Sequence, residues 1–245
     1  MAMDFKYDKI EDVDESCIVG YKGIYNKYVK RIIDLILSVL LFVILSPVFV
    51  IISVAIIIDS GFPVFYRAER GGYKNKTFKI FKFRTMVKNA DKIGGGTTAL
   101  NDSRITRIGN LLRKTKADEI ANLISIIKGN MSFIGPRPEL LRYTNAYEGV
   151  EKYILEVRPG ITDYSSIEFI NLDEIVGNEN ADEYYEKYVL KKKNLLRVKY
   201  AATVSFKTDA VLFFRTVFDV IKKALKFIFV RSEKKEKVND GIHNT

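Results

Sequence analysis

Residues 32–58 are IIDLILSVLLFVILSPVFVIISVAIII, and this apolar run decides the fold. A continuous helix of that length would extend roughly 40 Å, enough to cross a hydrocarbon core about 30 Å thick. Ser46-Pro47 lies at the midpoint, however, and a proline removes one backbone hydrogen bond and crowds the preceding turn. Each half alone would extend only about 20 Å, which is too short to cross. The run therefore predicts either a kinked span or a hairpin that enters the membrane and returns.

Basic residues flank the apolar run on both sides. Lys30 and Arg31 precede it, and Arg67 and Arg70 follow it. Basic residues next to a membrane segment favour the cytoplasmic side. Because both ends carry them, we predict the re-entrant hairpin, broken at Ser46-Pro47, with both ends in the cytoplasm. The kinked span stays open as the alternative.

The composition limits the chemistry that the chain can use. A net charge of +10 over 245 residues calls for an anionic partner, whether nucleic acid, lipid headgroups or a phosphorylated substrate. Cys17 is the only cysteine, so no internal disulfide can form, which suits a reducing compartment. The only histidine is His243, in a polar tail, which excludes Ser-His-Asp triads, Cys-His pairs and histidine-built zinc sites. Catalysis would have to use carboxylates, Lys and Arg side chains, hydroxyls or an oxygen-bound metal ion.

The expected fold class is α+β and mostly helical, with a small cytoplasmic catalytic domain. Along the chain we expect a loosely held polar leader (1–29), the re-entrant membrane helix (30–60), the catalytic domain (61–208), an amphipathic helix (209–230) and a charged tail (231–245). The basic, amphipathic pattern of the fourth segment favours a helix lying on the membrane surface, although a helix docked on the domain would have the same pattern.

Within the domain, short β-prone pieces come first and helices follow. Val64–Tyr66 and Phe78–Phe83 predict a hairpin or a strand–loop–strand unit. Asp102-Ser103 is a candidate cap for a helix of about ten residues, and residues 179–198 have a heavily charged helical pattern.

The densest group of candidate catalytic residues surrounds Asp118 and Glu119. Thr115 and Asp118 have the spacing of a capping box, which predicts that a helix starts here, runs to Lys128 and carries both acids in its first turn. The basic neighbours of this pair, at positions 113, 114 and 116, should keep the carboxylates ionised, as a nucleophile or a Mg²⁺ ligand must be. A plain helix cap remains the structural alternative.

Two further basic clusters are candidates for substrate binding. Arg137 lies between Pro136 and Pro138, whose rings fix the backbone and present the guanidinium at little ordering cost. Lys82 and Arg84 alternate with aromatic residues and could face a phosphate or only line a solvated strand. Such interleaving also suits single-stranded nucleic acid.

The order of the motifs resembles the bacterial sugar transferases, the family of monotopic phosphoglycosyl transferases, from about Lys30 to Thr216. The motifs that carry the resemblance are Lys30-Arg31-x-x-Asp34, Ser46-Pro47, Pro63–Tyr66 with Arg70-Gly71, Lys82–Met86, Arg104–Gly109, Leu111–Thr115 before Asp118-Glu119, Gly135–Glu139 and Arg158–Thr162. Any one of them is weak, but their shared order is highly specific.

The resemblance implies an enzyme of the bacterial inner membrane, on its cytoplasmic face. It implies that Asp118 attacks the sugar-bearing phosphate of a UDP-sugar, releases UMP, and passes the phosphosugar to a polyprenyl phosphate, which we expect to be undecaprenyl phosphate. Glu119 would complete the dyad and, with Asp118, hold Mg²⁺, while Arg113 would hold phosphate and Pro136–Pro138 would face the nucleotide. The product would be the first membrane intermediate of a surface glycan, such as lipopolysaccharide or capsule, or of a protein-linked glycan. Phosphoryl transfer needs positioning and charge neutralisation, so the lack of histidine is no obstacle.

The chain also departs from the family pattern. After Gly160-Ile161-Thr162 the family commonly continues Gly-Trp-Ala-Gln-Val-Asn-Gly-Arg, whereas this chain continues from Asp163 to Ile170 without the arginine that would contact phosphate. Asn130 stands where an acid is frequent. The dyad is intact, so the departures bear on the sugar more than on the reaction. The alternatives kept are a membrane-tethered nucleic-acid-binding protein and a structural anchor. We expect membrane lipid but no nucleic acid as a partner, and both a monomer and a homodimer stay open.

Overall fold

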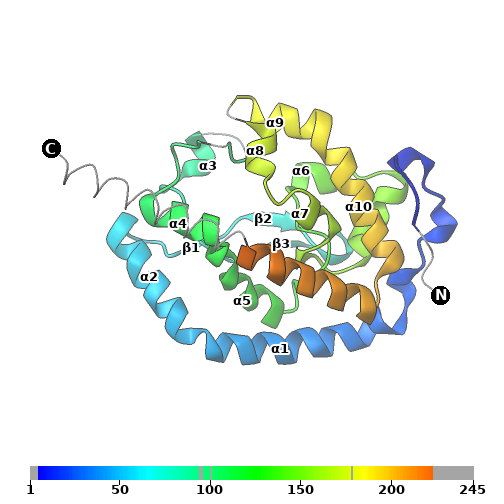
Figure 1. The fold of residues 1–245 in the computed structure, drawn as a ribbon, viewed down its shortest axis with the longest axis horizontal. Helices are drawn as coiled ribbons and strands as arrows, with labels where there is room; N and C mark the ends of the chain where they lie inside the picture. Colours follow the sequence, from blue (N-terminus) through cyan, green and yellow to red (C-terminus); the bar gives the residue numbers. More distant parts are fainter. Residues whose placement is uncertain (1–4, 94–95, 100, 178, 223–245) are drawn as a thin grey trace, which may run out of the picture.

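The apolar run forms two helices that meet at a bend along one edge of the molecule. The computed structural model describes residues 5–93, 96–99, 101–177 and 179–222. Figure 1 shows α1 (Lys30–Ile44) and α2 (Ser46–Ser60) as a bent rod, with the other elements packed on its inner side. The described part is mostly helical with few strands, which agrees with the predicted α+β class.

Short elements build the domain above the rod. Its α-helices are α3 (Ala90–Ile93), α4 (Arg107–Thr115), α5 (Asn122–Ile127), α6 (Leu141–Thr144), α7 (Tyr164–Glu168), α8 (Leu172–Val176), α9 (Ala181–Tyr184) and α10 (Leu190–Thr203). Short 3₁₀ or π helices connect them or precede the rod: η1 (Ile10–Asp12), η2 (Glu15–Cys17), η3 (Gly20–Lys22), η4 (Tyr25–Val29), η5 (Tyr73–Asn75), η6 (Ala117–Ala121), η7 (Gly149–Glu156) and η8 (Tyr185–Val189).

In the described part of the chain, the strands form three two-stranded ladders. In two antiparallel ladders, β1 (Phe65–Tyr66) pairs with β4 (Lys82–Phe83) and β2 (Glu69–Gly71) pairs with β3 (Thr77–Lys79). This confirms the strand–loop–strand unit predicted after the apolar run. In the third, parallel ladder, β5 (Ser132–Ile134) pairs with β6 (Gly160–Thr162), with Ser132 opposite Gly160.

The bend between α1 and α2 follows from the Ser46-Pro47 pair. Pro47 has no N–H to donate to the carbonyl of Val43, and the Ser46 hydroxyl donates to that carbonyl instead, at 2.8 Å. Leu45, between the helices, has non-helical backbone angles. Among the described residues, no single helix is long and apolar enough to cross a membrane. The stretches Tyr25–Ile44 and Ser46–Ser60, bent by 63°, meet that requirement only together, by length and composition.

One face of the rod is part of the domain core, and the opposite face is apolar and exposed. On α2, Phe49, Ile52 and Ile56 are buried in the cluster that includes Phe83 and Leu112. The exposed side chains of the rod include Ile32, Ile36, Val43, Ile44, Val50, Ile51 and Ile58, each more than half exposed. Because apolar surface in water is unfavourable, this outer face needs an apolar surrounding.

Arg31 fixes the inner face of α1 to α5. Its guanidinium donates to the carbonyls of Ile126 and Ile127, at 2.6 and 2.9 Å. These carbonyls lie at the C-terminus of α5, where the helix itself supplies few backbone donors. The carbonyl of Ile126 also accepts from the backbone N–H of Gly129 at 2.9 Å. Lys30 and Asp34 are buried on the same side of α1, and the main-chain N–H of Phe133 donates to Asp34.

The polar leader is not loosely held, so that prediction is wrong for residues 5–29. Ile10, Val13 and Ile18 are buried in the same core cluster as Val198 and Tyr200 of α10. The leader also approaches α10 through its backbone, because a Cβ on Gly20 would lie 2.5 Å from the carbonyl oxygen of Ala202. Isolated apolar residues in a charged segment show no period, so their burial was not visible in the sequence.

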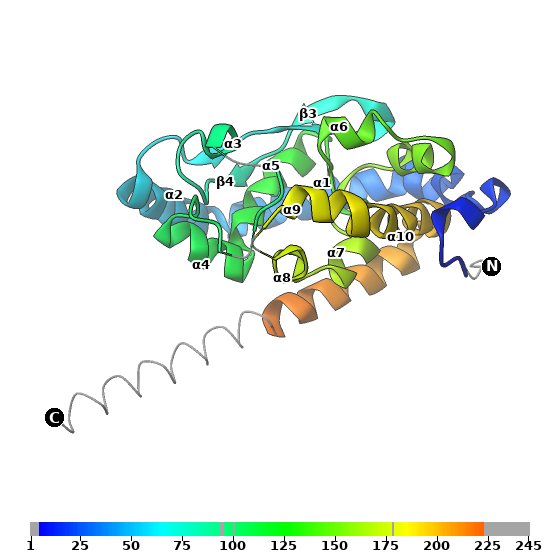
Figure 2. The ribbon, with the colours of Figure 1, turned by 90° about the horizontal axis from the view of Figure 1, so that it is seen from above.

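The C-terminal helix begins at residue 206, close to the predicted start of the amphipathic segment at 209. Leu212 is buried in the core and the Thr216 hydroxyl lies 2.8 Å from that of Thr162, while Phe214 and Phe218 are 70% and 66% exposed. In Figure 2 this orange helix crosses the lower face of the domain. Residues 223–230 of the predicted segment, and the tail 231–245, lie outside the described residues.

Candidate active site

Asp118 and Glu119 lie in the 3₁₀ turn η6, not in the first turn of a long helix. Helix α4 continues through Thr115, whose hydroxyl donates backwards to the carbonyls of Leu111 and Leu112. Lys116 then takes a left-handed conformation (φ 59°), which ends α4 and turns the chain sharply into η6. The predicted capping box is therefore wrong, because the hydroxyl that would cap the acids is used by the preceding helix.

Helix α4 also starts later than predicted. Thr106 is its N-cap and accepts a hydrogen bond from the Gly109 N–H at 3.0 Å. The proposed cap, Asp102, instead accepts from the backbone and guanidinium of Arg104. A carboxylate that has an arginine two residues away is satisfied locally and does not need a helix N-terminus.

Glu119 is held on both carboxylate oxygens. Arg137 donates to Oε1 at 2.6 Å and to Oε2 at 2.9 Å, and Lys82 donates to Oε1 at 3.3 Å. The two Arg137 bonds form the fork that suits a carboxylate. Burial alone would raise the pKa of Glu119, but the charges of Arg137 and Lys82 and the hydrogen bonds from Arg137 lower it well below its usual value. Glu119 is therefore ionised and fixed in orientation.

Asp118 is buried beside Glu119 but is much less restrained. Its side chain is 9% exposed, and its nearest cation is the Lys82 ammonium, 3.7 Å from Oδ2. Within the described part of the chain, no hydrogen bond is donated to its carboxylate. Burial raises the pKa of Asp118, an effect that Lys82 opposes and Glu119 reinforces. Two of the predicted basic neighbours, Arg113 and Lys116, do favour the charged form of Asp118, but burial still raises its pKa. Glu119 is kept ionised mainly by Arg137 and Lys82, which are not its neighbours in the chain.

The cations around the dyad come from separate elements. Lys82 on β4 contacts both carboxylates, and Arg113, in the last turn of α4, favours the ionised form of Asp118 by its charge. Burial lowers the pKa of Lys82 and of Lys116, against the attraction of Glu119. The structure thus brings together four of the predicted residues, Asp118, Glu119, Lys82 and Arg137, and places Arg113 next to them.

The Pro136–Pro138 turn is docked on β6. The carbonyl of Pro136 accepts from the Gly160 N–H at 3.0 Å, and Arg137 donates to the carbonyl of Ile161 at 3.0 Å. The approach is so close that a Cβ on Gly160 would lie 2.2 Å from the backbone nitrogen of Gly135, so only glycine fits. The turn positions Arg137, while binding of a nucleotide by the flanking prolines stays a prediction.

Arg84, predicted to bind substrate, points to the end of α2. Its Nη2 donates to the carbonyls of Ser60 and Gly61, at 2.8 and 2.6 Å, and to the Ser60 hydroxyl. These contacts cap the C-terminus of the rod. Arg84 lines the same large cavity as the dyad, so its role toward substrate stays a prediction, and the contact that the structure shows is structural.

A cavity of about 1,930 Å³ opens beside the dyad. Its walls include the dyad and its cations, the loop from Gly96 to Ala99, the segment from Ser166 to Glu174, and residues of the C-terminal helix. Glu139, Tyr185 and Lys193 also line it, and none of them was predicted as a site residue. Glu139 ends the Gly135–Glu139 motif of the resemblance, while Lys193 has only its helical spacing from Arg197, which is common in charged helices.

The carboxylates of the site determine how the predicted Mg²⁺ could be bound. Among the described residues, no group of three or more His, Cys, Asp or Glu side chains could hold a metal. Mg²⁺ often binds through one or two carboxylates, with waters and substrate phosphates completing its shell. Asp118 fits this role because its oxygens accept no hydrogen bond, whereas Glu119 would have to give up a bond from Arg137 or Lys82.

Comparison with known proteins identifies a family to which the chain is similar. The model of the bacterial sugar transferases matches residues 25–223. A UDP-glucose:undecaprenyl-phosphate glucose-1-phosphate transferase of Escherichia coli (strain K12) is 38% identical over 146 residues, 58% of this chain and 31% of that protein. An undecaprenyl-phosphate glucose phosphotransferase of Komagataeibacter xylinus is 33% identical over 196 residues, 77% of this chain and 35% of that protein.

The name of a third relative specifies a different sugar. The UDP-N-acetylgalactosamine-undecaprenyl-phosphate N-acetylgalactosaminephosphotransferase of Aeromonas hydrophila is 32% identical over 143 residues, 57% of this chain and 34% of that protein. The chain thus spans about a third of the length of these relatives.

Proposed function

The chain belongs to the bacterial sugar transferase family, and from this premise we propose that it transfers a sugar 1-phosphate from a UDP-sugar to undecaprenyl phosphate. The single observation that carries the proposal is the asymmetric dyad. Glu119 is clamped by Arg137, while Asp118 lies next to it, buried, hydrogen-bond free within the described residues, and open to the cavity. An enzyme that uses covalent catalysis needs such a free nucleophile beside a fixed charge.

The reaction has two displacements at phosphorus. In the first, a carboxylate oxygen of Asp118 forms a bond to the sugar-bearing phosphate of the donor, the bond to the bridging oxygen breaks, and UMP leaves with that oxygen. In the second, an oxygen of undecaprenyl phosphate forms a bond to the same phosphorus, and the Asp118 carboxylate is released. Both steps need no proton shuttle, which suits a site built of carboxylates and cations.

The surrounding side chains would neutralise and orient the phosphates. Lys82 lies within 3.7 Å of both carboxylates and can shield an incoming diphosphate from them. Arg113 faces the same cavity. If Mg²⁺ is bound, Asp118 and the donor phosphates would hold it, with Glu119 entering the shell at the cost of one of its bonds, and the ion would neutralise developing charge on the leaving group.

The function predicts a stoichiometric release of UMP. Membranes containing the protein, given Mg²⁺ and a panel of UDP-sugars without acceptor, should release one UMP per enzyme from the preferred donor. Adding undecaprenyl phosphate should then start continuous release, and EDTA should slow it by about tenfold or more. Release of UMP only in the presence of acceptor would contradict the covalent intermediate, and no release from any donor would contradict the donor class.

We further propose that the rod re-enters the membrane and that the protein is monotopic, with its domain on the cytoplasmic face. The 63° bend, the apolar outer face of α1 and α2, and the burial of their inner face in the domain support this topology. A helix that crossed the bilayer would have to separate α2 from the core around Phe83.

Topology can be tested at the bend. Replacing Ser46 by Leu and Pro47 by Ala should favour one straight helix and move the N-terminus across the membrane, at the cost of the contacts of Ile10, Val13 and Ile18 with the domain core. On a Cys17→Ser background, a cysteine at the exposed position Lys9 should resist an impermeant maleimide in intact cells, and become labelled when both replacements are present. A cysteine at Glu148, on the domain, is the control and should stay unlabelled. Labelling of Lys9→Cys without the helix replacements would refute the hairpin.

A further inference from the structure

Lys193 is a buried cation whose donors are not used by the fold. It lies on α10 with 5% of its surface exposed and lines the cavity of the dyad. Its ammonium is 3.9 Å from Oε1 of Glu139 and 5.1 Å from the centre of the Tyr185 ring. An ammonium has three N–H donors, and within the described part of the chain none of them makes a hydrogen bond. Both contacts are therefore electrostatic only.

Glu139 already has a better partner than Lys193. Arg197, fully buried one turn further along α10, donates to Oε1 of Glu139, and so does the Tyr185 hydroxyl. Arg197 also donates to Oδ1 of Asn194 at 2.8 Å. Burial would raise the pKa of Glu139, but Arg197 and Lys193 lower it to about 2. Glu139 is thus one ionised carboxylate between two cations, of which Arg197 holds it directly.

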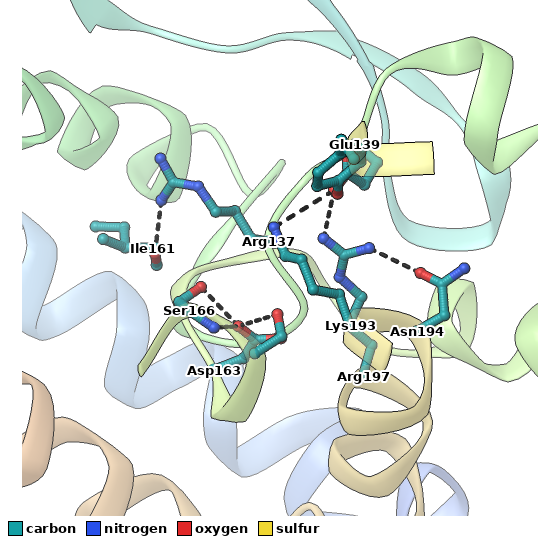
Figure 3. Close-up of polar contacts among 10 residues, drawn as sticks. Arg137, Glu139, Ile161, Asp163, Ser166, Lys193, Asn194 and Arg197 are labelled. Carbon is teal, nitrogen blue, oxygen red and sulfur yellow. Dashed lines mark hydrogen bonds and ion pairs between the residues drawn. The ribbon is translucent and has the colours of Figure 1, made fainter. Parts of the chain in front are cut away.

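Asp163, a second carboxylate near Lys193, does not form an ion pair with it. Asp163 accepts hydrogen bonds from the N–H of Ser166 at 2.8 Å and from the hydroxyls of Ser165 and Ser166, and so caps α7. Its distance to the Lys193 ammonium exceeds that of an ion pair. Figure 3 shows the Lys193 side chain reaching from α10 toward the turn that carries Arg137 and Glu139, with Asp163 and Ser166 bonded to each other below it.

An ammonium on the cavity wall that makes no hydrogen bond to the protein loses part of its solvation, and the Glu139 carboxylate at 3.9 Å offsets only part of that cost. The cost is offset when a ligand supplies the missing acceptors. We propose that Lys193 is a second anion-binding point of the cavity, on the α10 wall, and that it binds an anionic oxygen group of the sugar nucleotide. The proposal rests on the proposed function for the identity of the ligand. The group is either a phosphate of the donor or a carboxylate on its sugar.

The charge of Lys193 should be sensitive to mildly alkaline pH. Burial and repulsion by Arg197 lower its pKa to about 8, against attraction by Glu139. The charged or titratable groups around it are Glu139 and Arg137 from the turn before α6, Asp163 at the start of α7, Tyr185 in η8 and Arg197 on α10. Since the ammonium loses its proton as the pH rises through about 8, affinity for the anionic group should fall there in the wild type and not in a variant without Lys193.

The test is nucleotide binding by the full-length protein in detergent. Lys193→Met keeps the length of the side chain and removes its charge, and Lys192→Met makes the same change at the neighbouring exposed position. With UDP, UDP-glucose and UDP-glucuronate as probes in calorimetry, we expect Lys193→Met to lose about tenfold in affinity and Lys192→Met less than twofold. Loss for all three probes assigns a phosphate, and loss for UDP-glucuronate alone assigns a sugar carboxylate. Equal affinity of Lys193→Met and wild type for all three overturns the proposal.

Two further measurements distinguish the proposed anion site from a purely structural role of Lys193 and from a wrong donor class. If Lys193 were only structural, Lys193→Met would unfold at a lower temperature and its folded fraction would bind all probes as the wild type does. We expect instead an unfolding midpoint equal to or above that of the wild type. If the wild type binds none of the nucleotides, the donor class is wrong, and inorganic pyrophosphate becomes the probe. A loss of pyrophosphate affinity in Lys193→Met would then support the anion site, and unchanged affinity or no wild-type binding would overturn it.

Discussion

Replacing Asp118 by Asn should reduce turnover by about 10⁴-fold or more, because the variant lacks the oxygen nucleophile that starts the proposed transfer. The measurement is UMP release from the preferred UDP-sugar, together with mass spectrometry of the protein after incubation without acceptor. The wild type should gain the mass of one phosphosugar, and the variant should gain none. Asp12→Asn, an exposed replacement in the leader, should behave as the wild type.

Stability distinguishes this outcome from a structural role. Because burial raises the pKa of Asp118, its ionised form is the less favourable one in the folded protein. At pH values above that pKa the charge lowers stability, so Asn should leave the free energy of unfolding unchanged or increase it. A helix cap predicts the opposite, a loss of stability with normal turnover. The same raised pKa predicts that the rate falls on acidification at a pH above about 4, the ordinary range of an aspartate.

The features that depend on local chemistry could be predicted from the sequence. The break in the apolar run follows from Pro47, and the structure adds only that the Ser46 hydroxyl takes the carbonyl that the proline leaves free. The pairing of Phe65-Tyr66 with Lys82-Phe83 agrees with the two predicted strand segments, whereas β2, which lies between these segments, was not predicted. At the Pro47 break the residues that set the geometry are neighbours in the chain, so the sequence contains the whole interaction.

Features that depend on competition between alternative partners, or on packing, could not be predicted. The capping box has the right spacing, but Lys116 turns the chain out of the helix before the acids, and the Thr115 hydroxyl bonds backwards. Arg84 was predicted to bind substrate together with Lys82, two residues before it, yet it caps α2. The clamp between Glu119 and Arg137, the burial that separates the two carboxylates, and the unused ammonium of Lys193 all arise from packing.

Replacing Arg137 by Met should destabilise the protein by about 3 kcal/mol and lower turnover by about a hundredfold or more. Glu119 would lose both bonds of the fork while staying buried, since its side chain is 12% exposed. Lys82 would remain as its partner at 3.3 Å, and would then be less available to Asp118 and to the donor phosphates. Chemical unfolding in detergent and UMP release measure the two effects.

The matched control is Arg142→Met. Arg142 likewise forms ion pairs, in its case with Asp182 and Glu186, but its side chain is 49% exposed. Exposed pairs contribute less than about 1 kcal/mol, so this variant should be nearly as stable and as active as the wild type. Adding Glu119→Gln to Arg137→Met should restore part of the stability, because a neutral amide costs less to bury than a carboxylate short of partners, while turnover stays low. If Arg137→Met were as stable as Arg142→Met, Lys82 alone would suffice to hold Glu119, and the clamp would not be what separates the roles of the two acids.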